Sequence, residues 1–202
     1  MALLFCTIRN PKSAFRNPEM NFWQGRLVRL RGVEPSDAES FARWNLDSEA
    51  ARELDFTWPP VSLTSIVKDT EELARRKFEA DDFFFIIEGG AGVAVGSIDA
   101  RARNRRAGTF RYGVFVEREH RRCGYATEAA QLVLKYYFDE LRYQKCTVSV
   151  HANNEASIAL HEKLGFQREG TLRRMVYTGG RYLDTHYYGL TREEWEQSPL
   201  RV

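Results

Sequence analysis

The sequence has few of the features that mark secreted, metal-binding or membrane-spanning proteins. Its three cysteines, Cys6, Cys123 and Cys146, are odd in number and too widely spaced for a disulfide framework or a CxxC metal knuckle. The longest apolar runs, such as residues 83–87, fall far short of the roughly 18 residues that span a bilayer. We therefore expect a cytoplasmic protein without a metal or a membrane segment.

The chain has enough apolar and charged residues to fold as one domain. It contains 202 residues, of which 43% are hydrophobic, 13% aromatic and 29% charged. Residues 1–18 contain three basic residues, two prolines and no acid, and regular patterning begins only at Trp23. We predict an N-terminal extension over residues 1–22 and one domain over residues 23–202. The apolar start is too short to support export.

The net charge of +2 conceals two segments of opposite sign. Residues 34–55 hold seven acids and two arginines, whereas residues 101–122 hold eight arginines and two glutamates. This segregation predicts one anionic and one cationic partner, and two solvated faces are the simpler alternative. The arginines of residues 101–106 also suggest nucleic-acid binding. They fit a hairpin loop equally well, so nucleic acid is the less favoured partner.

Hydrophobic periodicity predicts an α+β chain. The glycine-rich turn at residues 89–92 misses the GxGxxG spacing and precedes a strand, which argues against a nucleotide loop. Segments with a hydrophobic period of two residues, typical of strands, alternate along the chain with segments that have a period of 3.6 residues, typical of helices. We expect strands at residues 26–31, 83–88, 93–98, 109–116, 145–150, 172–177 and 182–190, and helices at 35–46, 62–79, from 125 onward and at 155–164.

A strand, a basic glycine turn and a helix follow one another around residue 120. A helix N-terminus offers unpaired N–H groups and the positive end of its dipole, so it can hold a phosphate. Gly124 would allow close approach of the backbone, Ala126 would keep the first turn clear, and Arg121 and Arg122 would add charge. By spacing alone, the pattern also fits an ordinary turn with surface arginines.

Three segments in this order resemble the GNAT N-acetyltransferases. Residues 121–126 resemble their Q/R-x-x-G-x-G/A acyl-CoA signature, and residues 154–166 resemble their N-x-x-A/S…Y-E-K-x-G-F segment. Residues 168–195 look like the C-terminal hairpin of the RimJ/RimL-like branch, the ribosomal-protein alanine N-acetyltransferases. The resemblance implies a GNAT fold, with a mixed, largely antiparallel sheet of six to seven strands, flanked by helices and splayed at the acyl-CoA site.

The resemblance also implies a reaction and a cofactor site. Acetyl-CoA would donate an acetyl group to a primary amine, either a protein N-terminus or a small cationic amine. The pyrophosphate would lie on the backbone of the glycine turn, and the pantetheine arm along the preceding strand. Asn154 would hold the arm from the other side and would also serve as a helix N-cap. The residues implied are Phe115, Val116, Arg121, Arg122, Cys123, Gly124, Tyr125, Ala126 and Asn154.

Direct attack of an amine on a thioester needs a base, an oxyanion donor and an acid for the departing thiolate. The family's tyrosine acid corresponds to His161, and the serine of the Rim branch corresponds to Ser157. His161 would alternatively be a half-exposed surface residue. In the family, a carboxylate at one of two positions can act as the general base. The corresponding residues here are Val176 and Arg111, and neither side chain accepts a proton.

The remaining carboxylates leave the base open. Asp99, Glu117, Glu169 and Asp184 are candidates, and Asp184 would alternatively pin the final hairpin. We therefore expect that no single carboxylate substitution abolishes activity.

The acidic segment predicts the acceptor side. In this family the acceptor wall is formed by the helices that correspond to residues 35–46 and 62–79 with their connecting loop, where the negative charges would attract a cationic amine. Trp44, Phe56 and Trp58 would pack against its apolar parts. A non-catalytic acyl-CoA binder, an arginine-rich nucleic-acid module and, more weakly, a Cys/His hydrolase are the alternatives, and a homodimer is left open.

Overall fold

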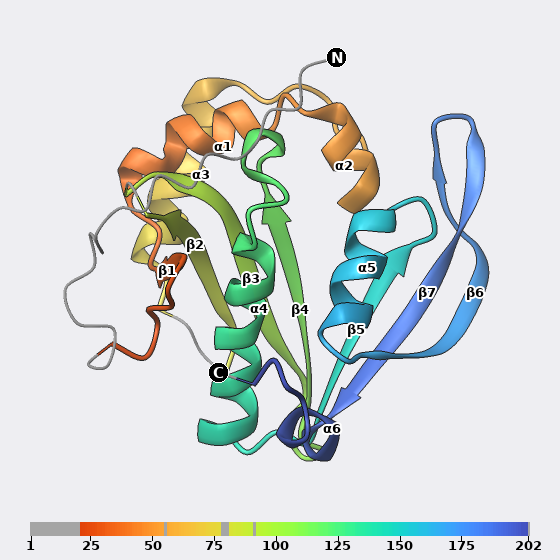
Figure 1. Ribbon diagram of the computed structural model, residues 1–202. Helices are drawn as coiled ribbons and strands as arrows, with labels where there is room; N and C mark the ends of the chain where they lie inside the picture. Colours follow the sequence, from red (N-terminus) through yellow and green to blue (C-terminus); the bar gives the residue numbers. More distant parts are fainter. Residues whose placement is uncertain (1–20, 55, 78–80, 91, 202) are drawn as a thin grey trace.

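A seven-stranded sheet crosses the protein in the order β1-β2-β3-β4-β5-β7-β6 (Figure 1). The computed structural model describes residues 21–54, 56–77, 81–90 and 92–201. Neighbouring strands are antiparallel, except that β4 and β5 are parallel, so the predicted mixed sheet is confirmed. The strands are β1 (Val28–Arg31), β2 (Phe83–Gly89), β3 (Ala94–Asn104), β4 (Thr109–Val116), β5 (Lys145–His151), β6 (Gln167–Thr178) and β7 (Arg181–Thr191).

Helices cover both faces of the sheet. Ile87 of β2 belongs to the core under α4, whereas the adjacent Ile86 packs with Trp44 and Leu73 under α1 and α3. Successive residues of a strand point to opposite faces, which assigns these helices to opposite sides. The helices are α1 (Ala38–Trp44), α2 (Ser48–Leu54), α3 (Leu63–Arg75), α4 (Tyr125–Lys135), α5 (Glu155–Lys163) and α6 (Arg192–Glu196), and a π-helical turn, Tyr136–Glu140, extends α4.

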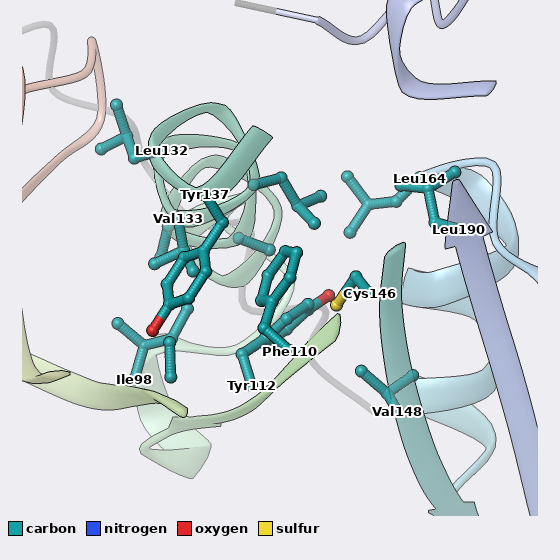
Figure 2. Packing of buried hydrophobic residues seen from close by; sticks show 14 of the residues in the cluster. Ile98, Phe110, Tyr112, Leu132, Val133, Tyr137, Cys146, Val148, Leu164 and Leu190 are labelled. Atoms are coloured by element: carbon teal, nitrogen blue, oxygen red, sulfur yellow. The ribbon is translucent and has the colours of Figure 1, made fainter. Parts of the chain in front are cut away.

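The main core lies between α4 and the centre of the sheet (Figure 2). The apolar face predicted for this helix is confirmed, because Ala129, Ala130, Val133 and Tyr137 are all buried. The Tyr137 ring stacks on Phe110 of β4, with 4.1 Å between the ring centroids. This packing fixes α4 against the strand that precedes it.

The first turn of α4 is also attached to the start of β1. The Glu128 carboxylate accepts backbone N–H bonds from Arg26, Leu27 and Val28, at 2.9, 2.6 and 2.8 Å. These contacts hold residues 26–28 against α4, and β1 begins at Val28 rather than at residue 26. The glycine turn before α4 is thus held from two sides.

Several predicted boundaries were wrong. Residues 48–54 form α2, which the sequence analysis missed although Asp47 accepts the N–H of Ala50 as an N-cap would. Helix α3 ends at Arg75, because Arg76 is extended. Strand β3 continues to Asn104, so Arg101 and Arg103 lie in a strand rather than in the predicted loop. The final hairpin is also longer, since β6 begins at Gln167.

Strands β4 and β5 part soon after they begin. They pair only at Thr109↔Lys145 and Phe110↔Cys146, whereas β4 stays paired with β3 as far as Val116. From Arg111 onward, the edge of β4 that faces β5 pairs with no strand among the residues that the structure describes. Figure 1 shows the two strands diverging toward α2 and the N-terminus of α5. The predicted splay of the sheet is confirmed.

Candidate functional site

Two cavities open where β4 and β5 part. The first, about 760 Å³, lies on the glycine turn before α4, and we call it the turn cavity. The second, about 460 Å³, is lined by Asp99, Arg101, Arg103 and Arg111 among others, and we call it the arginine cavity. Both volumes suit small ligands. The cavities share Glu53, Leu54, Val114, Asn154 and Ser157, so they meet between β4 and the start of α5.

The turn cavity gathers most of the residues predicted to hold the cofactor. Its lining includes the β4 edge at Val114 and the first residues of α4 and α5. Of the nine predicted residues, only Cys123 is missing from that lining. The others are Phe115, Val116, Arg121, Arg122, Gly124, Tyr125, Ala126 and Asn154.

The backbone of the turn suits a bound phosphate. Gly124 has φ +86° and Arg122 has φ +65°, both in the left-handed region. The φ of Gly124 favours glycine, and a Cβ atom there would lie 3.0 Å from Leu27 Cδ1, a tight contact that the leucine side chain would have to relieve. Helix α4 begins at Tyr125, and its first residues line the cavity, so the unpaired N–H groups of a helix N-terminus are available there to an anion. The residues present therefore fit the pyrophosphate of CoA.

The two arginines of the turn have different surroundings. The Arg121 Nε group donates to the Val116 carbonyl at 3.1 Å, and the guanidinium pairs with Glu53 at 3.0 Å. Arg121 therefore connects the turn to β4 and α2. Arg122 is exposed, and within the described part of the chain it makes no ion pair. Arg122 is thus the turn arginine available to a ligand phosphate.

The acidic segment of α1 and α2 contacts the basic segment of the same chain. Arg118 pairs with Asp47 at 2.9 Å and with Glu49 at 2.8 Å, and this guanidinium lowers the pKa of Asp47 to about 2. Arg43 of α1 pairs with Glu117 at 2.6 Å. Asp47 and Glu49, two of the acids expected to attract a cationic amine, are therefore neutralised internally. Asp55, the last acid of the segment, lies outside the described residues.

Asn154 has a local structural role in addition to lining both cavities. Its Oδ1 accepts the backbone N–H of Ser157 at 2.9 Å, which confirms it as the N-cap of α5. Its Nδ2 donates to the Glu53 carbonyl at 3.1 Å. Asn154 thus joins α5 to α2, the helix that the sequence analysis missed.

Ser157 lies where the two cavities meet, on the first turn of α5. Its hydroxyl lies 3.3 Å from His161 Nδ1, and the same nitrogen lies 2.7 Å from the Ser157 carbonyl. The carbonyl can only accept, so Nδ1 carries the proton and donates it there. Ser157 therefore lines both cavities, and the imidazole of His161 contacts both its hydroxyl and its carbonyl.

His161 lies inside the protein, and the alternative of a half-exposed surface residue was wrong. It is 3% exposed and packs among the rings of Tyr112, Phe166 and Tyr188. Burial lowers the pKa of its imidazole to about 4. His161 is therefore neutral at pH 7, with its one proton on Nδ1.

Of the four carboxylates considered as a base, Asp99 alone lines either of the two cavities described above. Burial raises its pKa, although Arg101 and Arg111 act in the opposite direction. Asp184 instead accepts the backbone N–H of Arg174, at a bulge of β6, at 2.9 Å. This contact corresponds to the alternative in which Asp184 pins the hairpin.

The other two carboxylates are held by basic partners outside both cavities. Glu117 pairs with Arg43, which lowers the pKa of the glutamate. Glu169 pairs with Lys145. Neither group is placed to accept a proton from a ligand in the arginine cavity.

The described residues also bear on metal and membrane roles. Among them, no group of three or more histidine, cysteine, aspartate or glutamate side chains could hold a metal ion. Within the same ranges, no helix is long and apolar enough to cross a membrane. Cys146 is a free, buried cysteine.

Proteins of related sequence are acetyltransferases. The acetyltransferase (GNAT) domain family matches residues 27–167. An uncharacterized prophage-derived N-acetyltransferase of Bacillus subtilis, YokL, is 38% identical over 177 residues, which cover 88% of this chain and 97% of YokL. The putative ribosomal N-acetyltransferase YdaF, also of Bacillus subtilis, is 27% identical, and the match covers 84% of this chain and 93% of YdaF.

Solved structures give the same result for the fold. The crystal structure of a putative acetyltransferase has a TM-score of 0.70 at 26% identity, with 86% of this chain and 87% of that one covered. A Vibrio cholerae spermidine N-acetyltransferase, in complex with CoA and spermine, has a TM-score of 0.72 at 19% identity, covering 84% and 98%. Together with the family match and the splayed sheet, these likenesses establish that the chain belongs to the GNAT acetyltransferase family and is an N-acetyltransferase.

Proposed function

We propose that the protein transfers the acetyl group of acetyl-CoA directly to a primary amine, with the donor in the turn cavity and the acceptor in the arginine cavity. The observation that carries this proposal is the meeting of the two cavities at Val114, Asn154 and Ser157. A donor and an acceptor that enter from different sides would come into contact there. Such positioning supplies much of the catalysis of a bimolecular reaction.

The turn cavity would hold acetyl-CoA mainly through the main chain. The amides of residues 122–126 and the Arg122 side chain would bind the pyrophosphate at the N-terminus of α4. The pantetheine arm would lie along the unpaired edge of β4 at Phe115 and Val116, in the manner of an added strand. An N–H group of that edge would also be available to the oxyanion. The donor supplies a thioester, which is an activated acyl group.

Ser157 is the better candidate for the acid that protonates the departing thiolate. Its hydroxyl faces the point where the cavities meet, whereas His161 lines only the arginine cavity. The imidazole of His161 is neutral at pH 7, and its one N–H group donates a hydrogen bond to the Ser157 carbonyl. We therefore assign His161 a positioning role, in which it orients Ser157.

Asp99 is the best candidate for the base. An amine is mostly protonated at pH 7, so a carboxylate or a water chain must remove a proton before attack. Burial makes Asp99 a stronger base than an exposed aspartate, and its pair with Arg101 keeps it ionised. Asp99 on β3 is opposite Gly113 on β4, one residue from the meeting point at Val114.

The branch of the family and the class of acceptor are inferred from the names of related proteins and from the size of the arginine cavity. The likeness to a putative ribosomal N-acetyltransferase supports the RimJ/RimL-like branch, and hence a protein N-terminus as acceptor. Relatives named for spermidine and for L-amino acids favour a small amine instead. We favour a small amine, because the arginine cavity has only about 460 Å³. A cytoplasmic location and a homodimer remain part of the proposal.

Thermal unfolding with and without acetyl-CoA, followed by a thiol-release assay with a panel of amines, tests this function. Acetyl-CoA should raise the melting temperature by several degrees at concentrations well above its Kd. At least one primary amine should then release CoA at a rate that saturates with amine. An unchanged melting temperature, together with steeply salt-dependent binding to RNA or DNA, would instead support the nucleic-acid module.

A further inference from the structure

Arginines of two neighbouring strands converge on the arginine cavity. Arg101 and Arg103 lie two residues apart on β3 and therefore on one face of the sheet. Arg111 of β4 is directly opposite Arg101 in the strand register, and all three line the cavity. Like charges that face each other across an antiparallel pair destabilise it. An anion bound between these side chains would remove that repulsion.

The acids of the cavity form an ion pair with only one of these three arginines, Arg101. Asp99 pairs with Arg101 at 3.1 Å, and the other lining acid, Glu53, pairs with Arg121 of the turn at 3.0 Å. Throughout the part of the chain that the structure describes, no hydrogen bond or ion pair engages Arg103 or Arg111. Two guanidinium groups at this cavity are therefore available to a ligand.

We propose that the acceptor is anionic: a small primary amine that also carries a carboxylate or phosphate group, which Arg103 and Arg111 bind. This inference rests on the proposed function, since it assigns the arginine cavity to the acceptor. The planar guanidinium matches both groups with two parallel hydrogen bonds. A polyamine would bring positive charge to the same arginines.

The positions of the charges match the two ends of such an acceptor. Arg111 lies three residues before Val114 on β4, or roughly 10 Å along a strand. Asp99 lies between them, because a Cβ atom on Gly113 would be 2.9 Å from its Oδ1. The amine would thus meet Asp99 near the thioester while the anionic group meets the arginines. Several bonds would separate the two ends, as in glutamate or a short acidic peptide.

Matched acceptors test this inference in the thiol-release assay. Glutamate, an acidic dipeptide and O-phosphoethanolamine would each be compared with the corresponding uncharged amide or ester, and with spermidine. We expect kcat/KM for the best anionic amine to exceed that of its neutral partner at least tenfold. Comparing the three anionic compounds shows whether the preferred acceptor is a free amino acid, a peptide or a phosphate ester. A preference for neutral amines or for spermidine would overturn the inference.

Substitutions locate the preference in the cavity. Arg111→Gln and Arg103→Gln should each raise the KM for the anionic amine about tenfold and leave that of its neutral partner within twofold. The matched control is Arg106→Gln, because Arg106 is exposed in the turn after β3 and lines neither cavity. Arg111→Gln should leave the melting temperature unchanged or slightly higher, since it removes an opposed like charge. An equal loss with both acceptors would contradict the inference.

Binding measurements separate this inference from the proposed function. Titration calorimetry of glutamate and glutaminol into the CoA-saturated protein measures the preference without turnover. Tighter binding of glutamate, weakened by Arg111→Gln, would support the anion site even if no acetyl transfer were found. Acetyl transfer to neutral amines with no calorimetric preference would leave the proposed function standing and refute the anionic acceptor.

Discussion

The turn cavity and the arginine cavity meet at the same residues but are built from different groups. The turn cavity depends on backbone: a left-handed turn at Gly124, the start of α4 and the unpaired edge of β4. The arginine cavity is lined by charged side chains on β3 and β4, with Asp99 and Arg111 among them. Backbone geometry suits a ligand that a whole family shares, whereas side chains can be exchanged to suit one acceptor. The comparison supports the proposal that the donor binds in the first cavity and that the second determines acceptor specificity.

The largest effect should come from the backbone of the turn cavity. Gly124→Val would place a β-branched side chain at φ +86° and against Leu27, so the turn would have to shift. Losing charge-assisted bonds to the pyrophosphate in addition to this strain should raise the KM for acetyl-CoA roughly 300-fold.

The matched control for this change is Gly179→Val. Gly179 has φ +56° in the β6–β7 turn, and a Cβ atom there would contact nothing within 4 Å. The control should lose stability without a change in the KM for acetyl-CoA. If both variants raised that KM equally, general strain rather than the turn cavity would be responsible.

A second large effect should arise in the arginine cavity. Asp99→Asn removes the proposed base, so kcat should fall about 100-fold while the KM for acetyl-CoA stays within threefold. Glu169→Gln is the control, because Glu169 pairs with Lys145 outside both cavities and should lose less than threefold. A rate for Asp99→Asn close to that of the unmodified protein would assign proton removal to water alone.

His161, beneath the meeting point, should make stability depend on pH. Its pKa is lowered to about 4 in the folded state and is about 6.5 in the unfolded chain, so between these values only the unfolded chain binds the proton. Its contribution is fully present above pH 6.5 and declines as pH falls toward 4. Urea unfolding should show that His161→Phe reduces the loss of stability between pH 7 and 4.5 by about 2 to 3 kcal/mol. Equal losses in both proteins would contradict the buried, neutral imidazole.

The smallest effect should come from the acids beside the turn cavity. In the double variant Asp47→Asn with Glu49→Gln, only the pair with Arg118 is lost, so the KM for the acceptor should stay within twofold. Stability should fall only slightly, as is usual for exposed ion pairs. A tenfold rise in the acceptor KM would indicate that these acids bind the acceptor. It would contradict the assignment of acceptor specificity to the arginine cavity alone.

The sequence predicted the turn cavity far better than the arginine cavity. Gly124 has a conformation that other residues adopt only at a cost, and helix α4 has a strong apolar period, so both features are visible locally. The parting of β4 and β5 could be expected only from the resemblance to a family, because strand pairing depends on distant residues.

The sequence analysis missed the arginine cavity because only the register of the paired strands brings its residues together. Arg101 and Arg111 are ten positions apart and become neighbours only when β3 continues past Asp99 and pairs with β4. As a run in the sequence, the arginines of residues 101–106 were interpreted as a loop, whereas Arg111 was placed in the predicted strand 109–116. The alternation of alanine and arginine from Ala100 to Arg103 is the local signal that would have indicated a strand.

The charge of the two segments was also misinterpreted for a tertiary reason. The acids of residues 34–55 and the arginines of residues 101–122 were expected to face two different partners. Arg118 and Arg121 instead pair with acids of α2, which lies beside the turn in the folded chain. What remains for ligands is a smaller set of arginines, on the turn and on the sheet.

Initial rates measured over a grid of acetyl-CoA and acceptor concentrations test the central claim most directly. Two cavities that meet at Ser157 predict a complex with both substrates bound, so double-reciprocal plots should intersect. Parallel lines, with acetyl label retained on the protein in the absence of acceptor, would show a covalent acetyl-enzyme and contradict direct transfer between the two cavities.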